Sequence, residues 1–174
     1  MLKNLFSFQK LITLALLALV CVGGWGLAPV FAASGPTNVP VALNTSEMIS
    51  FTDNQLAHGK KLFNAACARC HVGGQTYPNP DVGLKLEDLE GATPARDNVM
   101  ALVDYVKNPV TYDGAESLVE YHPNTQLTSD YPRMRNLSDE DLKEIAGYIL
   151  VSAETIPGWG GTKSESHSNL AGYL

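Results

Sequence analysis

The sequence predicts an all-α domain in which a helix that leads into Cys67 crosses a helix near the C-terminal end. Two segments carry apolar residues at helical spacing: one runs into Cys67, and the other follows Ser138. A length of 174 residues with 45% hydrophobic and 17% charged residues suits one globular domain and excludes a disordered chain. The formal charge of −6 argues against nucleic acid as a partner, because phosphate backbones are bound by basic surfaces.

Residues 1–32 are typical of a cleaved secretory signal peptide. Lys3 and Lys10 form a positive n-region, and residues 11–22 form an apolar h-region. This run is shorter than the roughly 20 apolar residues of a membrane-spanning helix. A small-residue cleavage site, Val-Phe-Ala, follows at 30–32. We therefore expect an exported chain that begins after this site, with an uncleaved anchor as the alternative.

Cleavage removes Cys21, which leaves Cys67 and Cys70 as the cysteines of the exported chain, directly before His71. C-x-x-C-H is the attachment motif of haem c. Cysteines one helical turn apart can bond two vinyl groups at one porphyrin edge, and the next histidine can bind the iron. A disulfide here would close almost no loop, a zinc site needs four ligands, and a redox dithiol is expected after a strand rather than a helix. The motif predicts one covalent haem c in a cytochrome c-like domain, with His71 as the proximal ligand.

The N-terminal part of the exported chain predicts an arm followed by a helix. Residues 33–51 are polar and interrupted by prolines, which indicates an extended arm. A capping box that starts at Thr52 predicts the first residue of a helix that continues to Cys67. Gly59 in this helix, like Gly147 in the last one, would let another helix cross closely.

The middle of the chain is mostly loop in this interpretation. Residues 72–94 are rich in Gly, Pro and Asn, which indicates a loop around the porphyrin edge. A second helix is predicted over 96–106 and ends before Pro109. The turn at 112–114 is followed by a single helical turn predicted over 116–120.

The last helix has the clearest signals. Ser138 is a capping residue, three acidic residues fill the positive first turn, and apolar residues recur at helical spacing behind them. The haem domain is therefore expected to span 52–155, with a Gly- and Ser-rich tail over 156–174. Two aromatic residues of the tail could anchor it: Trp159 and Tyr173.

The second axial ligand of the iron decides the function, because methionine opposite histidine raises the reduction potential and a second imidazole should lower it. The remaining histidines and methionines of the exported chain are the candidates: Met48, Met100, Met134, His58, His122 and His167. Four of them are set aside because they lie in the arm, inside the first or second helix, or in the tail. His122 precedes a stiffening proline, and Met134 precedes the last helix. From the residues alone, the choice between these two stays open.

Several further segments carry a family resemblance. They are GKKLF at 59–63, ATPxRDN at 92–98, LVDYxKNPxTYDG at 102–114, HP at 122–123, YPxMRNL at 131–137, AGYIL at 146–150 and WGG at 159–161. Together with the haem motif, they resemble the extrinsic cytochrome c-550 of photosystem II in cyanobacteria and some algae. The resemblance extends from about residue 41 to 161, nearly the whole exported chain.

The resemblance implies that His122 is the distal ligand, so the haem is bis-histidine and low in potential, and that Met134 is a buried neighbour of the pocket. It implies a non-enzymatic subunit in the thylakoid lumen, peripheral to the membrane, bound to the photosystem II core and its other extrinsic subunits. There the family helps to retain calcium and chloride for oxygen evolution. The rival is a diffusible electron carrier with Met134 as the ligand. Residues 162–174 extend beyond the usual end of the family.

Overall fold

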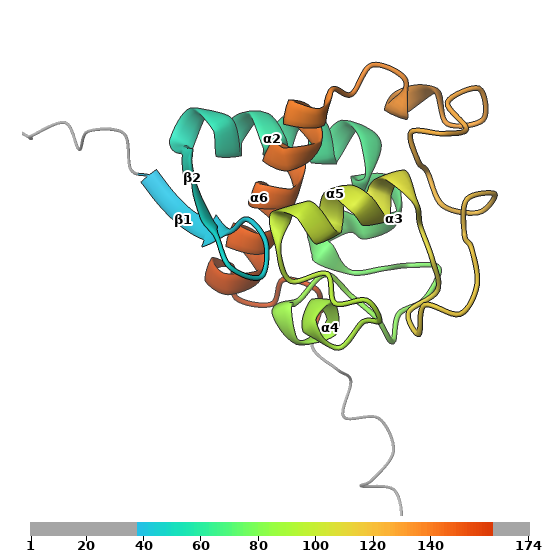
Figure 1. The fold of residues 1–174 in the computed structure, drawn as a ribbon, viewed down its shortest axis with the longest axis horizontal. Coiled ribbons are helices and arrows are strands. Elements are labelled where there is room, and N and C mark those ends of the chain that lie inside the picture. Colours follow the sequence, from blue (N-terminus) through green and yellow to red (C-terminus); the bar gives the residue numbers. More distant parts are fainter. Residues whose placement is uncertain (1–37, 162–174) are drawn as a thin grey trace, which may run out of the picture. The chain divides into compact units, whose positions relative to one another are not determined.

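Two long helices cross each other and organise the fold (Figure 1). The computed structural model describes residues 38–161. Helix α2 (Asp53–Ala66) packs against helix α6 (Asp139–Thr155), as the sequence predicted. A Cβ placed on Gly59 would collide with the backbone carbonyl of Glu144. The crossing therefore requires a residue without a side chain at position 59.

Both long helices begin at the capping residues that the sequence predicted. Thr52 Oγ1 accepts from the backbone N–H of Gln55, and the Gln55 side chain accepts from the Thr52 N–H at 3.0 Å. Ser138 and Asp141 form the same reciprocal pair at the start of α6, with bonds of 2.8 and 3.1 Å. Each capping box satisfies amide groups that have no partner inside the helix.

The extended arm predicted over 33–51 is instead, from residue 38 onward, a β-hairpin that belongs to the core. Strands β1 (Asn38–Ala42) and β2 (Met48–Thr52) pair antiparallel. Val41 and Phe51 are 4% and 0% exposed, and the Phe51 ring lies against Gly147 of α6. Pro40 hid the alternation of apolar side chains in β1, and a proline is tolerated in an edge strand.

Helix α5 (Val99–Lys107) begins three residues later than the predicted range of 96–106. Asn98 is its cap, because the Asn98 side chain accepts from the backbone N–H of Ala101 at 2.9 Å. The helix ends at Lys107, and its C-cap Asn108 directly precedes a proline, as predicted.

The connecting segments differ from the prediction in two places. A short helix, α4 (Leu86–Glu90), lies inside the predicted loop 72–94. The helical turn predicted over 116–120 is wrong, since Ser117 pairs with Val110 in an isolated β-bridge. Extended pairing is available there because the turn before it folds the chain back on itself.

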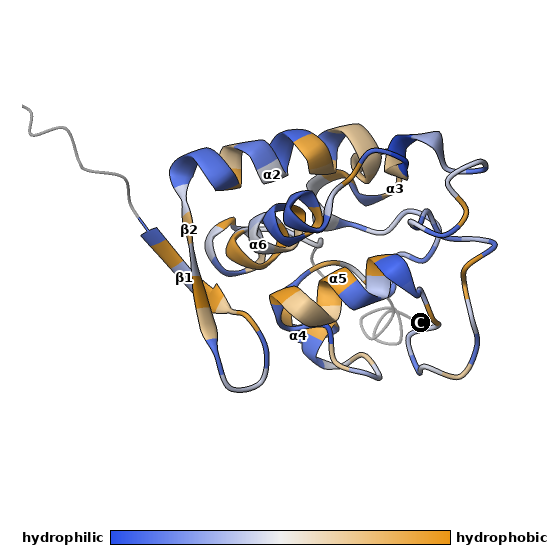
Figure 2. Cartoon of the chain, turned by 45° about the horizontal axis from the view of Figure 1, so that its top comes forward, coloured by the Kyte–Doolittle hydropathy of each residue, from blue (hydrophilic) through white to orange (hydrophobic). Residues whose placement is uncertain are grey.

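The core lies between α2, α5, α6 and the hairpin. Figure 2 shows a largely hydrophilic outer side on α2, whereas much of α5 is hydrophobic. Phe63, Tyr148 and Trp159 pack together with ring centroids 5.5 to 5.7 Å apart. Trp159, from the predicted tail, is only 7% exposed, so the tail contributes to the core up to this residue. Among residues 38–161, no helix has the length and apolar character needed to cross a bilayer.

Candidate haem site

The C-x-x-C-H motif lies at the junction between α2 and the short helix α3 (Ala68–His71). The Cys67 amide continues the ladder of α2 by donating to the Phe63 carbonyl at 2.8 Å, and the His71 amide donates to the Cys67 carbonyl at 3.0 Å. Cys67 and Cys70 are therefore one helical turn apart, and both are free thiols that remain partly accessible. This arrangement suits two thioether bonds to one porphyrin edge.

His71 and His122 meet although 50 residues separate them in the sequence. Their ring centroids are 6.1 Å apart and their planes differ by 52°. Two metal–imidazole bonds of about 2 Å each, plus about 1 Å from each nitrogen to its ring centre, require a separation of about 6 Å. The observed spacing thus fits two imidazoles on opposite sides of one iron ion.

One nitrogen of each ring is already occupied by the protein. Thr76 Oγ1 lies 3.2 Å from His71 Nδ1, and the Pro123 carbonyl accepts from His122 Nδ1 at 2.8 Å. Hydrogen bonds of this kind fix the tautomer and the plane of a ligating imidazole. With Nδ1 engaged in both rings, Nε2 is the nitrogen through which each histidine would bind iron.

Burial keeps the ligand candidates in defined protonation states. It lowers the pKa of His71 to about 4, with a smaller contribution from the neighbouring His122, and it also lowers the pKa of His122. Both rings are therefore neutral at pH 7, which is the form that binds a metal. Burial, and secondarily Cys70, raises the pKa of Cys67 to about 12, so this thiol is protonated.

The loop that carries His122 is held by Asn124, which sequence reasoning missed. Asn124 is fully buried, and its Nδ2 donates to the carbonyls of Val119 and His122 at 2.6 and 2.8 Å. Its Oδ1 accepts from the amides of Gln126 and Leu127 at 2.9 Å each. The one available signal was an asparagine in a His-Pro-Asn sequence, because Asn side chains commonly bond to the backbone of turns.

Sequence reasoning also missed the neighbours of His122. Tyr105 of α5 contacts the His122 ring nearly edge-on, with centroids 5.1 Å apart and an angle of 66°. The guanidinium carbon of Arg96 lies 3.9 Å from the centre of the Tyr105 ring. Arg96 and Tyr105 belong to two of the segments that carried the family resemblance, but nothing in their spacing indicated this contact.

The other ligand candidates are distributed over the fold. Met134 is 3% exposed in the 3₁₀ turn η2 (Pro132–Met134), whereas Met48 and Met100 are 65% and 43% exposed. His167 lies outside the described residues.

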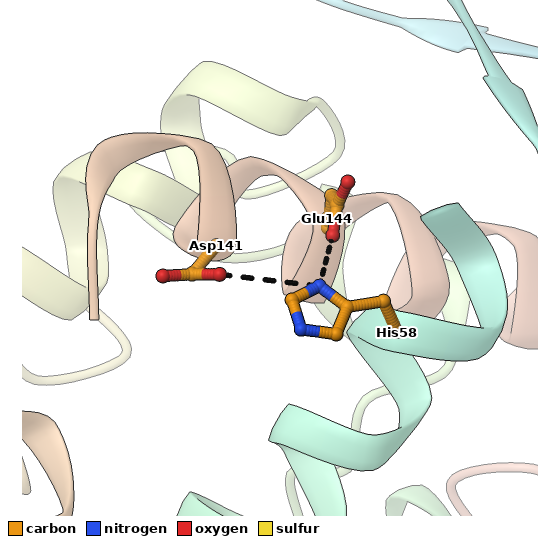
Figure 3. A group of neighbouring side chains, drawn as sticks. All are labelled: His58, Asp141 and Glu144. Atoms are coloured by element: carbon orange, nitrogen blue, oxygen red, sulfur yellow. Dashed lines mark hydrogen bonds and ion pairs between the residues drawn. The ribbon is translucent and has the colours of Figure 1, made fainter. Parts of the chain in front are cut away.

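His58 belongs to a separate polar cluster where α2 crosses α6 (Figure 3). Its Nδ1 lies 2.6 Å from a Glu144 carboxylate oxygen and 3.9 Å from Asp141 Oδ1. Asp141 also caps α6, so these contacts connect the two long helices. The cluster is accounted for by contacts within the fold, and His58 stays on α2, as predicted.

Comparisons with known proteins show which family the chain belongs to. Residues 32–166 match the cytochrome c-550 domain. The chain is 69% identical over 183 aligned positions, covering both proteins completely, to photosystem II extrinsic protein V of Synechococcus sp. (strain JA-2-3B'a(2-13)). It is 51% identical to the protein of the same name from Cyanophora paradoxa, over 71% of this chain and 76% of that one.

Solved structures agree with the fold. The crystal structure of cytochrome c549 matches with a TM-score of 0.68 and 43% identity, covering 70% of this chain and 95% of that one. The PsbV2 cytochrome of Thermosynechococcus elongatus matches with a TM-score of 0.63 and 40% identity, covering 72% and 90%. The predicted cytochrome c-like fold is therefore confirmed. In sequence and in fold, the chain belongs to the cytochrome c-550 family, a family of non-enzymatic cytochromes.

Proposed function

We propose that this protein is the lumenal extrinsic cytochrome c-550 subunit of photosystem II. It carries one haem c, attached by Cys67 and Cys70 and ligated by His71 and His122. The observation that supports this most directly is the pair of neutral imidazoles whose centres are 6.1 Å apart. The name of its relatives, photosystem II extrinsic protein V, supports the partner, and the leader predicted over 1–32 supports export into the lumen.

The protein contributes attachment, orientation and burial of the cofactor. When bound, the haem supplies a one-electron ferric–ferrous couple, which imidazole in place of a thioether would keep low in potential. Thr76 and the Pro123 carbonyl hold the ring planes of the two histidines. Asn124 bonds to the backbone carbonyls of Val119 and His122, and these bonds hold the loop that positions the His122 ring.

The role of the subunit is structural: it docks beside the other extrinsic proteins and helps the water-oxidising site to retain calcium and chloride. The chain has a formal charge of −6, and removal of the leader would take away two lysines and no acidic residue. Such a surface suits specific contacts with other proteins better than attraction to anionic lipid. The protein would therefore be peripheral to the membrane and held by the photosystem.

The test is reconstitution. Photosystem II particles stripped of this subunit should evolve little oxygen when calcium and chloride are low, and adding the purified holoprotein should restore the activity. Saturating calcium chloride should make the addition unnecessary. The proposal is overturned if the stripped and the restored particles evolve oxygen equally at low calcium and chloride.

A further inference from the structure

Arg96 is a cation held in place inside the fold. Its Nη2 donates to the carbonyls of Val110 and Thr111 at 3.1 and 2.9 Å. Its backbone amide donates to the Leu89 carbonyl at 2.8 Å. With both the backbone and the head group bonded, the guanidinium has little freedom to move away from Tyr105, whose ring centre lies 3.9 Å from the guanidinium carbon.

The stacked pair continues directly to the distal histidine. Tyr105 presents one face to Arg96 and contacts the His122 ring nearly edge-on at 5.1 Å. The guanidinium lies over the face of the Tyr105 ring, so the contact between them is a cation–π contact. Arginine stays protonated in proteins, so a full positive charge lies behind the distal ligand.

Arg96 also has a hydrogen-bond donor that the described residues do not satisfy. Its Nε is buried and has no acceptor among them. A buried N–H without a partner is costly, so such a group in a native fold calls for an acceptor from elsewhere.

We propose that Arg96 is a positioning residue for His122 that sets the reduction potential of the haem. Through Tyr105 it fixes the plane of the distal imidazole, and its charge favours the ferrous form, which is one unit less positive than the ferric form. This inference rests on the proposed ligation by His71 and His122. Arg96 itself neither binds the iron nor attaches the haem, so its role is additional to those of the four haem-binding residues.

The contacts limit the size of the effect. Arg96 lies 3.9 Å from Tyr105, and Tyr105 lies 5.1 Å from His122. An iron bound to His122 would lie about 3 Å beyond the centre of that ring, so the guanidinium is within about 12 Å of it. At this distance and an effective dielectric of about 20, a unit charge changes the ferrous–ferric equilibrium roughly tenfold. Arg96→Gln should thus lower the ferrous-to-ferric ratio at fixed potential roughly tenfold, or about 59 mV for one electron.

The experiment is a potentiometric titration of the purified holoprotein with a chemical reductant as the electron source, together with electron paramagnetic resonance of the ferric state. Arg96→Gln should lower the midpoint and change the low-spin signal. Arg96→Lys keeps the charge but loses the planar stack, so it should change the signal while shifting the ratio less than threefold. The matched control is Arg135→Gln, which removes the same charge from an exposed side chain and should shift the ratio less than twofold.

A ferrous-to-ferric ratio for Arg96→Gln that stays within twofold of that of the unaltered protein at the same potential would overturn the proposal. If that variant does not fold, Tyr105→Leu tests the same contact, and an unchanged low-spin signal there would overturn it. The spectrum of the unaltered ferric protein separates this failure from failure of the proposed function. Methionine ligation would refute the proposed function, whereas bis-imidazole ligation with an unshifted midpoint refutes only the role of Arg96.

Discussion

Substituting Gly59 with alanine tests the helix crossing that supports the haem motif. A Cβ at this position would collide with the carbonyl oxygen of Glu144 and lie 3.2 Å from the amide nitrogen of Ile145. Both are backbone atoms of α6, so relief requires the helices to separate. Overpacking in a core costs about 1–3 kcal/mol, and the rigid partner places this site at the upper end of that range.

Helix propensity acts in the opposite direction. Alanine is better than glycine inside a helix by about 1 kcal/mol, so the net loss expected for Gly59→Ala is about 2 kcal/mol. Ala57→Gly, at an exposed position of the same helix, measures the propensity contribution in place. The free energy of unfolding of the holoproteins is measured by urea titration followed by circular dichroism. If the Gly59→Ala variant is as stable as the unaltered protein, or about 1 kcal/mol more stable, the geometry of the crossing is refuted.

Two further substitutions test the polar contacts around the site. Asn124→Ala removes the side chain that bonds to the carbonyls of Val119 and His122, and should destabilise the protein by about 2–3 kcal/mol in urea titrations; a loss below about 0.5 kcal/mol would contradict its role. His58→Ala leaves the buried Glu144 carboxylate without its imidazole, so a double-mutant cycle with Glu144→Gln should give a coupling free energy of about 0.5–2 kcal/mol. Additive effects in that cycle would show that the 2.6 Å contact contributes nothing to stability.

Much of the fold was predictable because its signals are local. The capping box at Thr52 and the capping residue Ser138 are read from a few neighbouring residues, and the structure confirms both. The glycine at position 59 also indicated a close crossing before its partner was known. Boundaries of this kind need no knowledge of the rest of the chain.

The missed features depend on contacts between distant segments. The hairpin over 38–52 is stabilised by burial of Phe51 against α6. The two segments are far apart in the sequence, so no local pattern indicated this contact. The residues next to Arg96 and Tyr105 in the sequence form no pattern that marks a haem site. Their place beside His122 follows only from the path of the loop that follows α5. For the same reason, residue chemistry alone left His122 and Met134 open, whereas the fold brings the His122 ring to His71.

The most direct test of the central claim is the absorption spectrum of the purified ferric holoprotein, compared with that of His122→Met. The unaltered protein should be low-spin and lack the sulfur-to-iron charge-transfer band at the red edge, because two imidazoles would hold the iron. His122→Met places a thioether in the same loop and should gain that band. A band already present in the unaltered protein, and lost in Met134→Leu, would show that Met134 is the ligand and would contradict the account.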